Sequence, residues 1–201
     1  MNVRLYHANT KVRPRNISFS GAQRLLPNVN YPKKNIKLIV LDIDGTISDR
    51  QTNRVSSEVK SAIKSVTSRG ITVILNTGRG YEEAAKVAEE LNLDTPIICN
   101  YGKYIKKAGK TIYENPSHRV DLKGDSLEYL ATKLGIKKEN IMSVGNDVED
   151  ISMFKKSGVA VLLSSSGYKS DSFDDIKQFA HYFADNSDNS AVALAIKKLV
   201  Q

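Results

Sequence analysis

The chain has 201 residues, of which 40% are hydrophobic and 26% are charged, and its formal net charge is +8. This composition is typical of a globular protein and excludes a fibrous, collagen-like or wholly disordered chain. The single cysteine, Cys99, excludes an internal disulfide and a zinc site built from several cysteines. No apolar run approaches the ~18 residues that a membrane helix needs, so we expect a soluble, cytoplasmic protein with no membrane span.

The positive charge is concentrated in residues 1–35, which contain seven Lys and Arg and no Asp or Glu. We interpret residues 1–35 as a basic N-terminal extension, either flexible or lying as a strap on a body formed by residues 36–201. Leu25 and Leu26 are among the side chains that can hold such a strap in place. The alternative is an arm that docks onto nucleic acid, a membrane surface or an acidic partner. Nucleic-acid binding is not the favoured interpretation, because the rest of the chain is nearly neutral.

Beyond residue 36, short β-branched runs alternate with segments whose apolar residues have helical spacing. The pattern predicts, in chain order, a strand at 36–41, a helix at 56–69, a strand at 71–75, a helix at 81–91, a strand at 96–99, a hairpin at 104–113, a helix at 126–134, strands at 140–144 and 158–163, and a helix at 191–199. This alternation predicts an α/β fold in which helices cover both faces of a central parallel sheet.

Polar residues follow several of the predicted strands, at the sheet edge where ligands bind in folds of this class. Asp42 and Asp44 follow the first strand, and Thr77 and Gly78 follow the second. The remaining candidates open the third helix or follow the fourth strand, and they are Lys123, Asn146, Asp147 and Asp150. Each short motif by itself is an ordinary turn, so the prediction of a site depends on their joint occurrence in this order.

These side chains suit phosphoryl transfer. A carboxylate such as Asp42 can attack phosphorus, and a second carboxyl such as Asp44 can protonate the leaving oxygen and later activate water. The Thr77 hydroxyl, the amides beside Gly78 and the Lys123 ammonium can hold the phosphoryl oxygens. A divalent cation relieves the repulsion between close carboxylates, and all-oxygen ligands favour Mg²⁺. The acidic residues after the fourth strand are therefore candidates to complete a metal site.

The order and spacing of the motifs are specific as a set. The motifs are LDIDGT (41–46), NTGR (76–79), LKGDSLEYLATKLGI (122–136) and VGNDVEDISMF (144–154). Together they resemble the haloacid dehalogenase superfamily of phosphohydrolases, and within it the Cof-type branch. The resemblance implies a Rossmann-like three-layer sandwich.

The resemblance also implies roles for individual residues. Asp42 is similar to the nucleophile of the superfamily, and Asp44 to its general acid/base, whose backbone carbonyl also binds the metal. Thr77, Gly78 and Lys123 correspond to the residues that bind phosphate. The implied ligands of Mg²⁺ come from the first and fourth motifs, and they are Asp42, Asp44, Asn146, Asp147 and Asp150.

Two features depart from the family pattern. The fourth motif normally begins with Gly-Asp, whereas here Asn146 follows the glycine. The negatively charged metal ligand of this motif would then be Asp147 or Asp150. Cof-type proteins also carry a cap domain between the second and third motifs. In this chain the predicted helix, strand and hairpin 104–113 use nearly all of that stretch, which leaves no room for a further domain. We therefore expect a core without a cap, or with the hairpin as a minimal one.

The favoured function is Mg²⁺-dependent hydrolysis of a small phosphorylated metabolite, such as a sugar phosphate, through an aspartyl-phosphate. We expect a homo-oligomer in which a neighbouring subunit covers the open site. One alternative is a catalytically weak or inactive scaffold, and another is a phosphatase for nucleic-acid ends that uses the basic arm. Tyr101 and Tyr104 can stack on a substrate, but packing within the hairpin is the favoured use of both rings.

Overall fold

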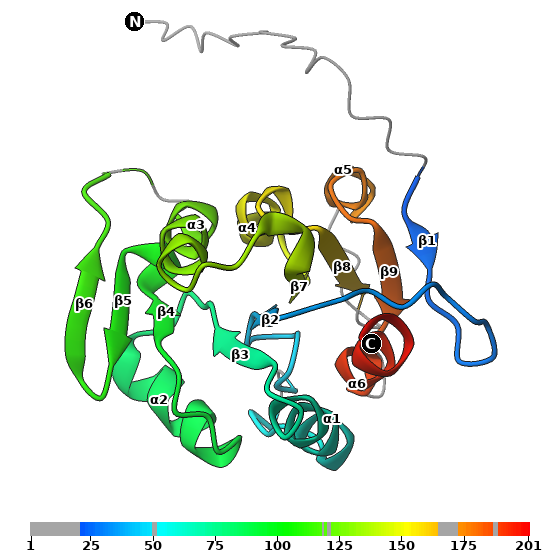
Figure 1. Cartoon of the computed structure of the whole chain (residues 1–201), viewed down its shortest axis with the longest axis horizontal. Helices are drawn as coiled ribbons and strands as arrows, with labels where there is room; N and C mark the ends of the chain where they lie inside the picture. Colours follow the sequence, from blue (N-terminus) through cyan, green and yellow to red (C-terminus); the bar gives the residue numbers. More distant parts are fainter. Residues whose placement is uncertain (1–20, 50–51, 118, 120–121, 165–172, 187–188) are drawn as a thin grey trace, which may run out of the picture.

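A parallel sheet of six strands, in the order β1-β9-β8-β7-β2-β3, forms the centre of the molecule (Figure 1). The strands are β1 (Gln23–Arg24), β2 (Leu38–Leu41), β3 (Thr72–Leu75), β7 (Ile141–Gly145), β8 (Val159–Ser164) and β9 (Tyr182–Asp185). The structure is a computed structural model that describes residues 21–49, 52–117, 119, 122–164, 173–186 and 189–201. The parallel order brings the carboxyl ends of β2, β3 and β7 to one edge of the sheet.

Three further strands continue the molecule beyond β3. The antiparallel hairpin of β5 (Tyr104–Lys107) and β6 (Lys110–Glu114) pairs through β5 with β4 (Ile97–Cys99). A parallel bridge between Asn76 and Ile98 places β4 beside the end of β3. Figure 1 shows this hairpin at the end of the molecule opposite to β1 and β9.

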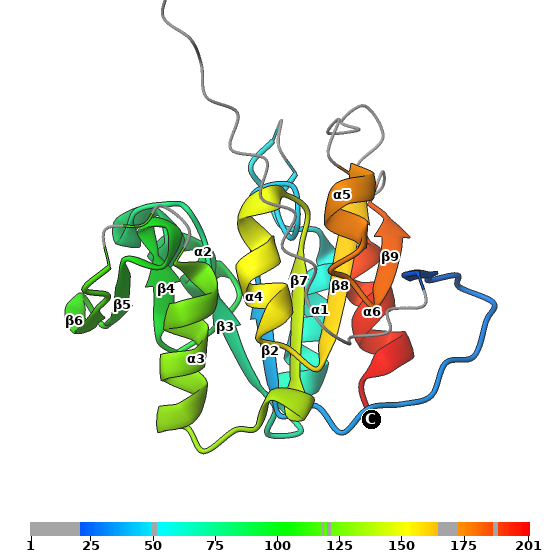
Figure 2. The same ribbon diagram turned by 90° about the horizontal axis from the view of Figure 1, so that it is seen from above.

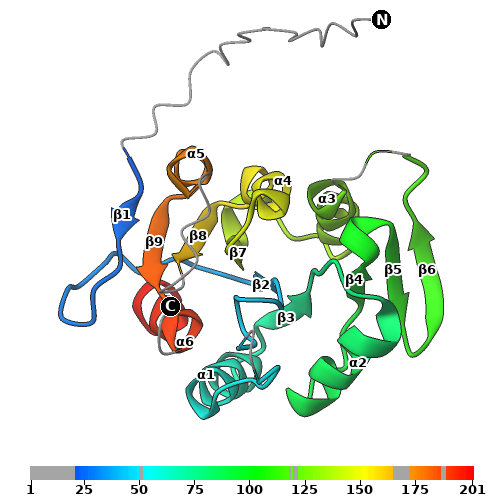
Figure 3. The same cartoon turned by 180° about the vertical axis from the view of Figure 1, so that it is seen from behind.

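Helices cover both faces of the sheet (Figures 1 and 3). One face carries α1 (Ser57–Thr67), α2 (Tyr81–Glu90) and α6 (Ala191–Leu199), and the other carries α3 (Lys123–Lys133), α4 (Ile151–Lys155) and α5 (Phe173–Lys177). Short 3₁₀ turns occur at η1 (Asn100–Gly102), η2 (Lys138–Asn140) and η3 (Val148–Asp150). Figure 2 shows α3 and α4 running alongside the strands. The predicted three-layer α/β fold is confirmed.

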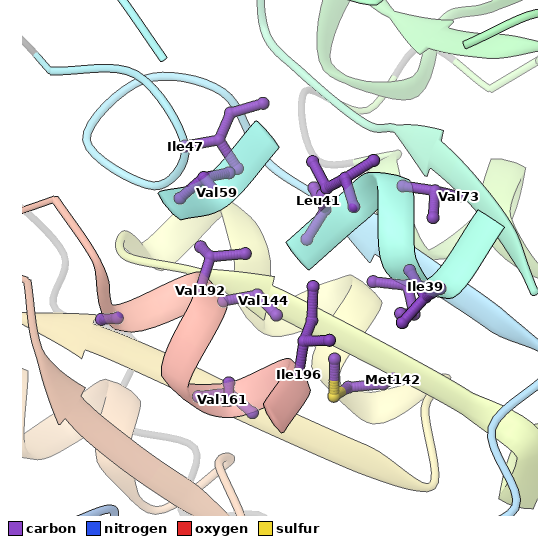
Figure 4. Close-up of a cluster of buried hydrophobic side chains, with 14 of the residues drawn as sticks. Ile39, Leu41, Ile47, Val59, Val73, Met142, Val144, Val161, Val192 and Ile196 are labelled. Carbon is purple, nitrogen blue, oxygen red and sulfur yellow. The ribbon is translucent and has the colours of Figure 1, made fainter. Parts of the chain in front are cut away.

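The buried strands divide their side chains between two cores. Ile39 and Leu41 of β2 point to the side of α1 and α6, where Figure 4 shows them with Val59 of α1 and Ile196 of α6. Leu38 and Val40 of the same strand belong to the cluster under α3, α4 and α5. All four β2 residues have no exposed surface. This two-sided burial explains why the strand is a continuous apolar run rather than an alternating one.

The sequence pattern missed several short elements. The helices α4 and α5 have five residues each, which is too short for helical spacing to show, and the strand β9 was not predicted. The predicted helix 126–134 was also placed too late, because α3 begins at Lys123. Gly124 argues against a helix by propensity, but a Cβ there would lie 2.4 Å from the backbone oxygen of Ser152. The close approach of α3 and α4 requires this glycine.

The described part of the basic N-terminal segment lies against the body. β1 pairs with β9, and Leu25 is buried whereas Leu26 is exposed. The Tyr31 ring meets the Tyr182 ring edge to face at 5.9 Å, and Lys33 Nζ donates to the backbone oxygen of Val200 at 2.9 Å. Residues 1–20 lie outside the described part of the chain, and the division of the chain at residue 35 stays a prediction. No helix in the described ranges has the length and apolarity to cross a membrane.

Candidate active site

The carboxyl ends of β2, β3 and β7 converge on a cavity of about 340 Å³. The lining residues come from the loops after these strands, from η1 and from the start of α3, and they are Asp42, Asp44, Gly78, Arg79, Tyr101, Lys123, Asn146, Asp147, Glu149 and Asp150. Seven of the eight predicted site residues are therefore brought together. The eighth, Thr77, is fully buried beside the cavity, where its hydroxyl accepts a hydrogen bond from the backbone N–H of Arg79 at 3.2 Å.

A buried ion cluster forms the floor of the cavity. Lys123 Nζ donates to Asp42 Oδ1 at 2.8 Å and to Asp150 Oδ1 at 2.7 Å, and all three side chains are at least nine-tenths buried. Burial raises the pKa of Asp42 to about 6, although the Lys123 ammonium opposes that shift. Burial by itself would lower the pKa of the Lys123 amine, but Asp150 and Asp42 outweigh this effect and raise it above its ordinary value. Lys123 is thus a cation fixed beside the proposed nucleophile.

Asp150 uses both of its carboxylate oxygens inside the protein. While Oδ1 contacts Lys123, Oδ2 accepts from the backbone N–H groups of Asn146 and Asp147 at 2.8 and 3.1 Å. Gly145 makes this approach feasible, because a Cβ at that position would lie 2.3 Å from Asp150 Oδ2. Asp150 therefore shapes the loop that presents Asn146 and Asp147.

Oxygen atoms suited to a divalent cation gather beside Asp42. The Thr46 hydroxyl lies 3.1 Å from Asp42 Oδ2 and 3.0 Å from Asn146 Oδ1. One hydroxyl proton satisfies only one of these two oxygens at a time, and a cation would stabilise both. Within the described ranges, no three His, Cys, Asp or Glu side chains lie close enough together to hold a metal ion by themselves. The donor set therefore fits a cation that keeps several water ligands, as Mg²⁺ does, rather than one held in an all-protein cage.

Asp44 stands at the mouth of the cavity in a bidentate ion pair. Arg79 Nε donates to Asp44 Oδ2 at 2.9 Å and Arg79 Nη2 to Asp44 Oδ1 at 2.5 Å, and Nη2 also contacts Asn53 Oδ1. The hydrogen bonds that Arg79 donates to Asp44 raise the pKa of Arg79 above its ordinary value. The sequence analysis gave Arg79 no role, although it ends the NTGR motif. A pairing between loops that follow different strands leaves no signal in residue spacing.

Tyr101 is a second cavity residue whose position the sequence reasoning did not predict. Its ring is 44% exposed and lines the cavity, so packing within the hairpin, the favoured use, is wrong for this residue. Tyr104, by contrast, belongs to β5, is partly buried and packs against the hydrophobic core. Tyr101 belongs to η1, the turn between β4 and β5, rather than to the hairpin itself.

Comparisons with known proteins show what this chain is similar to. A family model described as haloacid dehalogenase-like hydrolase matches residues 39–122 and 117–196. The 5-amino-6-(5-phospho-D-ribitylamino)uracil phosphatase YcsE of Bacillus subtilis is 22% identical, covering 83% of this chain and 96% of the relative. Phosphoglycolate phosphatase 1 of Saccharolobus solfataricus is also 22% identical, with the same shares covered.

A solved haloacid dehalogenase-like hydrolase from Bacteroides thetaiotaomicron has the same fold. It superposes with a TM-score of 0.68 at 18% identity, covering 81% of this chain and 98% of that one. The resemblance inferred from the four sequence motifs is confirmed by the match to the family model over most of the chain. This chain belongs to the haloacid dehalogenase-like hydrolase family.

Proposed function

We propose that this protein is a Mg²⁺-dependent phosphatase that hydrolyses small phosphomonoesters through a phosphorylated Asp42. The observation that carries the proposal is the contact between Asp42 Oδ1 and the buried ammonium of Lys123, on the floor of a cavity that Asp44 also lines. A carboxylate beside a fixed cation, with a second carboxyl nearby, is the arrangement that phosphoryl transfer to an aspartate requires.

The reaction has two steps. Asp42 attacks phosphorus and forms a new P–O bond while the bond to the leaving oxygen breaks, and Asp44 gives that oxygen a proton. Asp44 then takes a proton from a water molecule, which attacks phosphorus and releases phosphate from Asp42. Lys123 stabilises negative charge on the phosphoryl oxygens. A Mg²⁺ ion, when bound, would supply further neutralisation of that charge. Asp44 has to leave its ion pair with Arg79, or be turned within it, to reach the leaving oxygen.

We further propose roles for the loop after β7. Asp42, Asn146 and Asp147 would hold Mg²⁺ directly or through water, together with the backbone carbonyl of Asp44. Asp150 acts as a positioning residue, because its oxygens are taken by Lys123 and by two backbone N–H groups. This assignment differs from the prediction that Asp150 is itself a ligand.

The missing cap domain stays a prediction. It is supported by the alignment with the Bacillus relative. This alignment spans 248 positions although it covers only 83% of the 201-residue chain, so the relative has stretches without a counterpart here. The expected homo-oligomer also stays a prediction. A monomeric mass in light scattering at working concentration would contradict it.

The test of the proposed function is phosphate release from p-nitrophenyl phosphate with Mg²⁺ and with EDTA. We expect activity that needs Mg²⁺ and disappears in Asp42→Asn. The matched control is Asp94→Asn, which makes the same chemical change at a side chain that is 95% exposed. Wild-type protein that is folded but inactive with Mg²⁺ on a panel of phosphomonoesters would favour the inactive-scaffold alternative instead.

A further inference from the structure

We propose that Tyr101 is the specificity-determining residue of this cavity and that its ring stacks on substrates whose leaving group is a neutral aromatic or heteroaromatic ring. The inference rests on the proposed function, because it assigns the part of the substrate that lies beyond the phosphoryl group. It is carried by the position of the ring, by its exposure and by the backbone conformation that holds it there.

The Tyr101 ring lies directly over Gly78, next to the predicted phosphate site. A Cβ at residue 78 would be 2.5 Å from Tyr101 Cε1 and 2.6 Å from Cζ, so only glycine leaves room for the ring. The side chain nevertheless keeps 44% of its surface exposed and lines the same cavity as Asp42 and Asp44. One part of the ring is therefore seated on the protein, and the rest is available to a bound molecule.

The backbone at this position is strained. Asn100, Tyr101 and Gly102 follow one another with φ values of 50°, 55° and 90°. Glycine adopts such angles freely and asparagine tolerates them, but for tyrosine the left-handed conformation costs about 1–2 kcal/mol. Because the side chain is only partly buried, its packing offsets less of this cost than packing in the core would. Strain of this kind is typically retained at functional sites.

Hydrogen bonds fix the strained residue between two parts of the predicted catalytic machinery. The Tyr101 N–H donates to the backbone oxygen of Thr77, and the Tyr101 carbonyl accepts from the N–H of Leu122, both at 3.1 Å. Leu122 directly precedes Lys123 in the chain. The ring is thereby held at a set position relative to Thr77 on one side and Lys123 on the other.

The chemistry of the cavity rim identifies the ligand class. Among the ten cavity-lining residues in the described part of the chain, Tyr101 is the one with an aromatic ring, and the other nine are charged, amide-bearing or glycine. Arg79 lines the cavity with its guanidinium bound to Asp44 and Asn53, so its charge is already paired. Asp147 and Glu149 on the rim disfavour an anionic leaving group. A neutral flat ring gains most from this surface, because aromatic rings favour stacked or edge-to-face contacts.

The experiment compares Tyr101→Asn with Asn100→Gly. Asparagine removes the ring and tolerates the left-handed backbone, so Tyr101→Asn should fold at least as stably as the wild type. Asn100→Gly relaxes the neighbouring position and keeps the ring, and it is therefore the matched control. Tyr101→Phe, which keeps the ring without its hydroxyl, is the rescue variant.

Two readouts are measured for every variant. The first is kcat/KM for phenyl phosphate relative to glycerol 3-phosphate. We expect this ratio to fall about tenfold in Tyr101→Asn, mainly through KM for phenyl phosphate, and to be kept in Tyr101→Phe and Asn100→Gly. The second is the Kd of phenylphosphonate relative to methylphosphonate, measured by calorimetry, which needs no turnover because the C–P bond is not hydrolysed.

The two readouts separate failure of this inference from failure of the proposed function. Unchanged ratios in Tyr101→Asn, or equal affinity of the wild type for both phosphonates, would overturn the role of Tyr101 even in an active phosphatase. A wild-type protein that releases no phosphate but prefers phenylphosphonate through Tyr101 would overturn the reaction and support the ring-binding site.

Discussion

Asp42 and Asp150 share one ammonium group, that of Lys123, at 2.8 and 2.7 Å, in a position where almost no water reaches them. Two anions and one cation leave a net negative charge on the floor of the cavity. Burial makes that charge costly, which is why the pKa of Asp42 is raised to about 6 even beside Lys123. The cluster is therefore ready to accept further positive charge, such as that of a divalent cation.

Removing the Lys123 ammonium should destabilise the fold. Lys123→Met leaves two buried carboxylates without their shared partner, and we expect the free energy of unfolding to fall by about 3–5 kcal/mol at neutral pH. The loss should shrink at acidic pH, because a carboxyl whose pKa is raised takes up a proton there and relieves the repulsion. Urea denaturation at both pH values measures the difference. Adding Asp42→Asn to Lys123→Met should restore part of the lost free energy of unfolding. A double variant that is less stable than Lys123→Met alone would contradict this account.

Arg79 should act on the reaction through Asp44. Its bidentate contact sets the orientation of the Asp44 carboxyl, so we expect Arg79→Met to lower kcat by about tenfold or more. The loss should be larger for an alkyl phosphate, whose leaving oxygen needs a proton, than for p-nitrophenyl phosphate, whose leaving oxygen does not. In an Asp44→Asn background, Arg79→Met should add little. Equal losses on both substrates in both backgrounds would assign Arg79 a merely structural role.

Asn146 should limit the affinity for Mg²⁺. Asn146→Asp adds an anionic ligand beside Asp42 Oδ2, so we expect the Mg²⁺ concentration at half-maximal activity to fall about tenfold. Without Mg²⁺ the same variant should melt at a lower temperature, because the added carboxylate repels Asp42. Asp147→Asn should have the opposite effect on the Mg²⁺ requirement. An Asn146→Asp variant whose melting temperature responds to Mg²⁺ as the wild type does would contradict the proposed metal site.

His181 should give the fold a pH dependence that is independent of the active site. Its Nδ1 accepts a hydrogen bond from the Ala160 N–H at 3.0 Å, and burial, together with Lys138 and Lys34, lowers the pKa of the imidazole. Because the folded-state pKa lies below the unfolded one, the stabilisation is complete above the ordinary pKa of 6.5. It is lost as the pH falls through the lower folded-state value.

The matching experiment follows the melting temperature across the acidic to neutral range. We expect it to rise with pH toward neutrality in the wild type. His181→Asn keeps an acceptor for the Ala160 N–H but does not titrate, so the rise should be smaller in this variant. Parallel melting-temperature profiles in the wild type and His181→Asn would show that His181 does not couple to folding.

The sequence analysis and the structure agree where the signal is local. The continuous apolar run of β2, the helical spacing of α1 with Val59, Ile63 and Val66, and α6 at 191–199 were all predicted from residues near one another in the chain. The structure also brings Asp42, Lys123 and Asp150 into contact, as the joint occurrence of their motifs suggested. Their catalytic and metal-binding roles stay predictions, which the variants described here test.

By itself, the sequence determined the fold class and which polar residues gather at one sheet edge, because strand and helix periodicities and motif order are local properties. Tertiary structure decided how those residues are used. Asp150 accepts hydrogen bonds from Lys123 and from two backbone N–H groups of its own loop. Arg79 forms an ion pair with Asp44, and the Tyr101 ring lies over Gly78. The contacts of Lys123, Arg79 and Tyr101 each join segments that follow different strands. Spacing along the chain does not encode such contacts, since they depend on how the helices and strands pack and on backbone angles such as the positive φ of Tyr101.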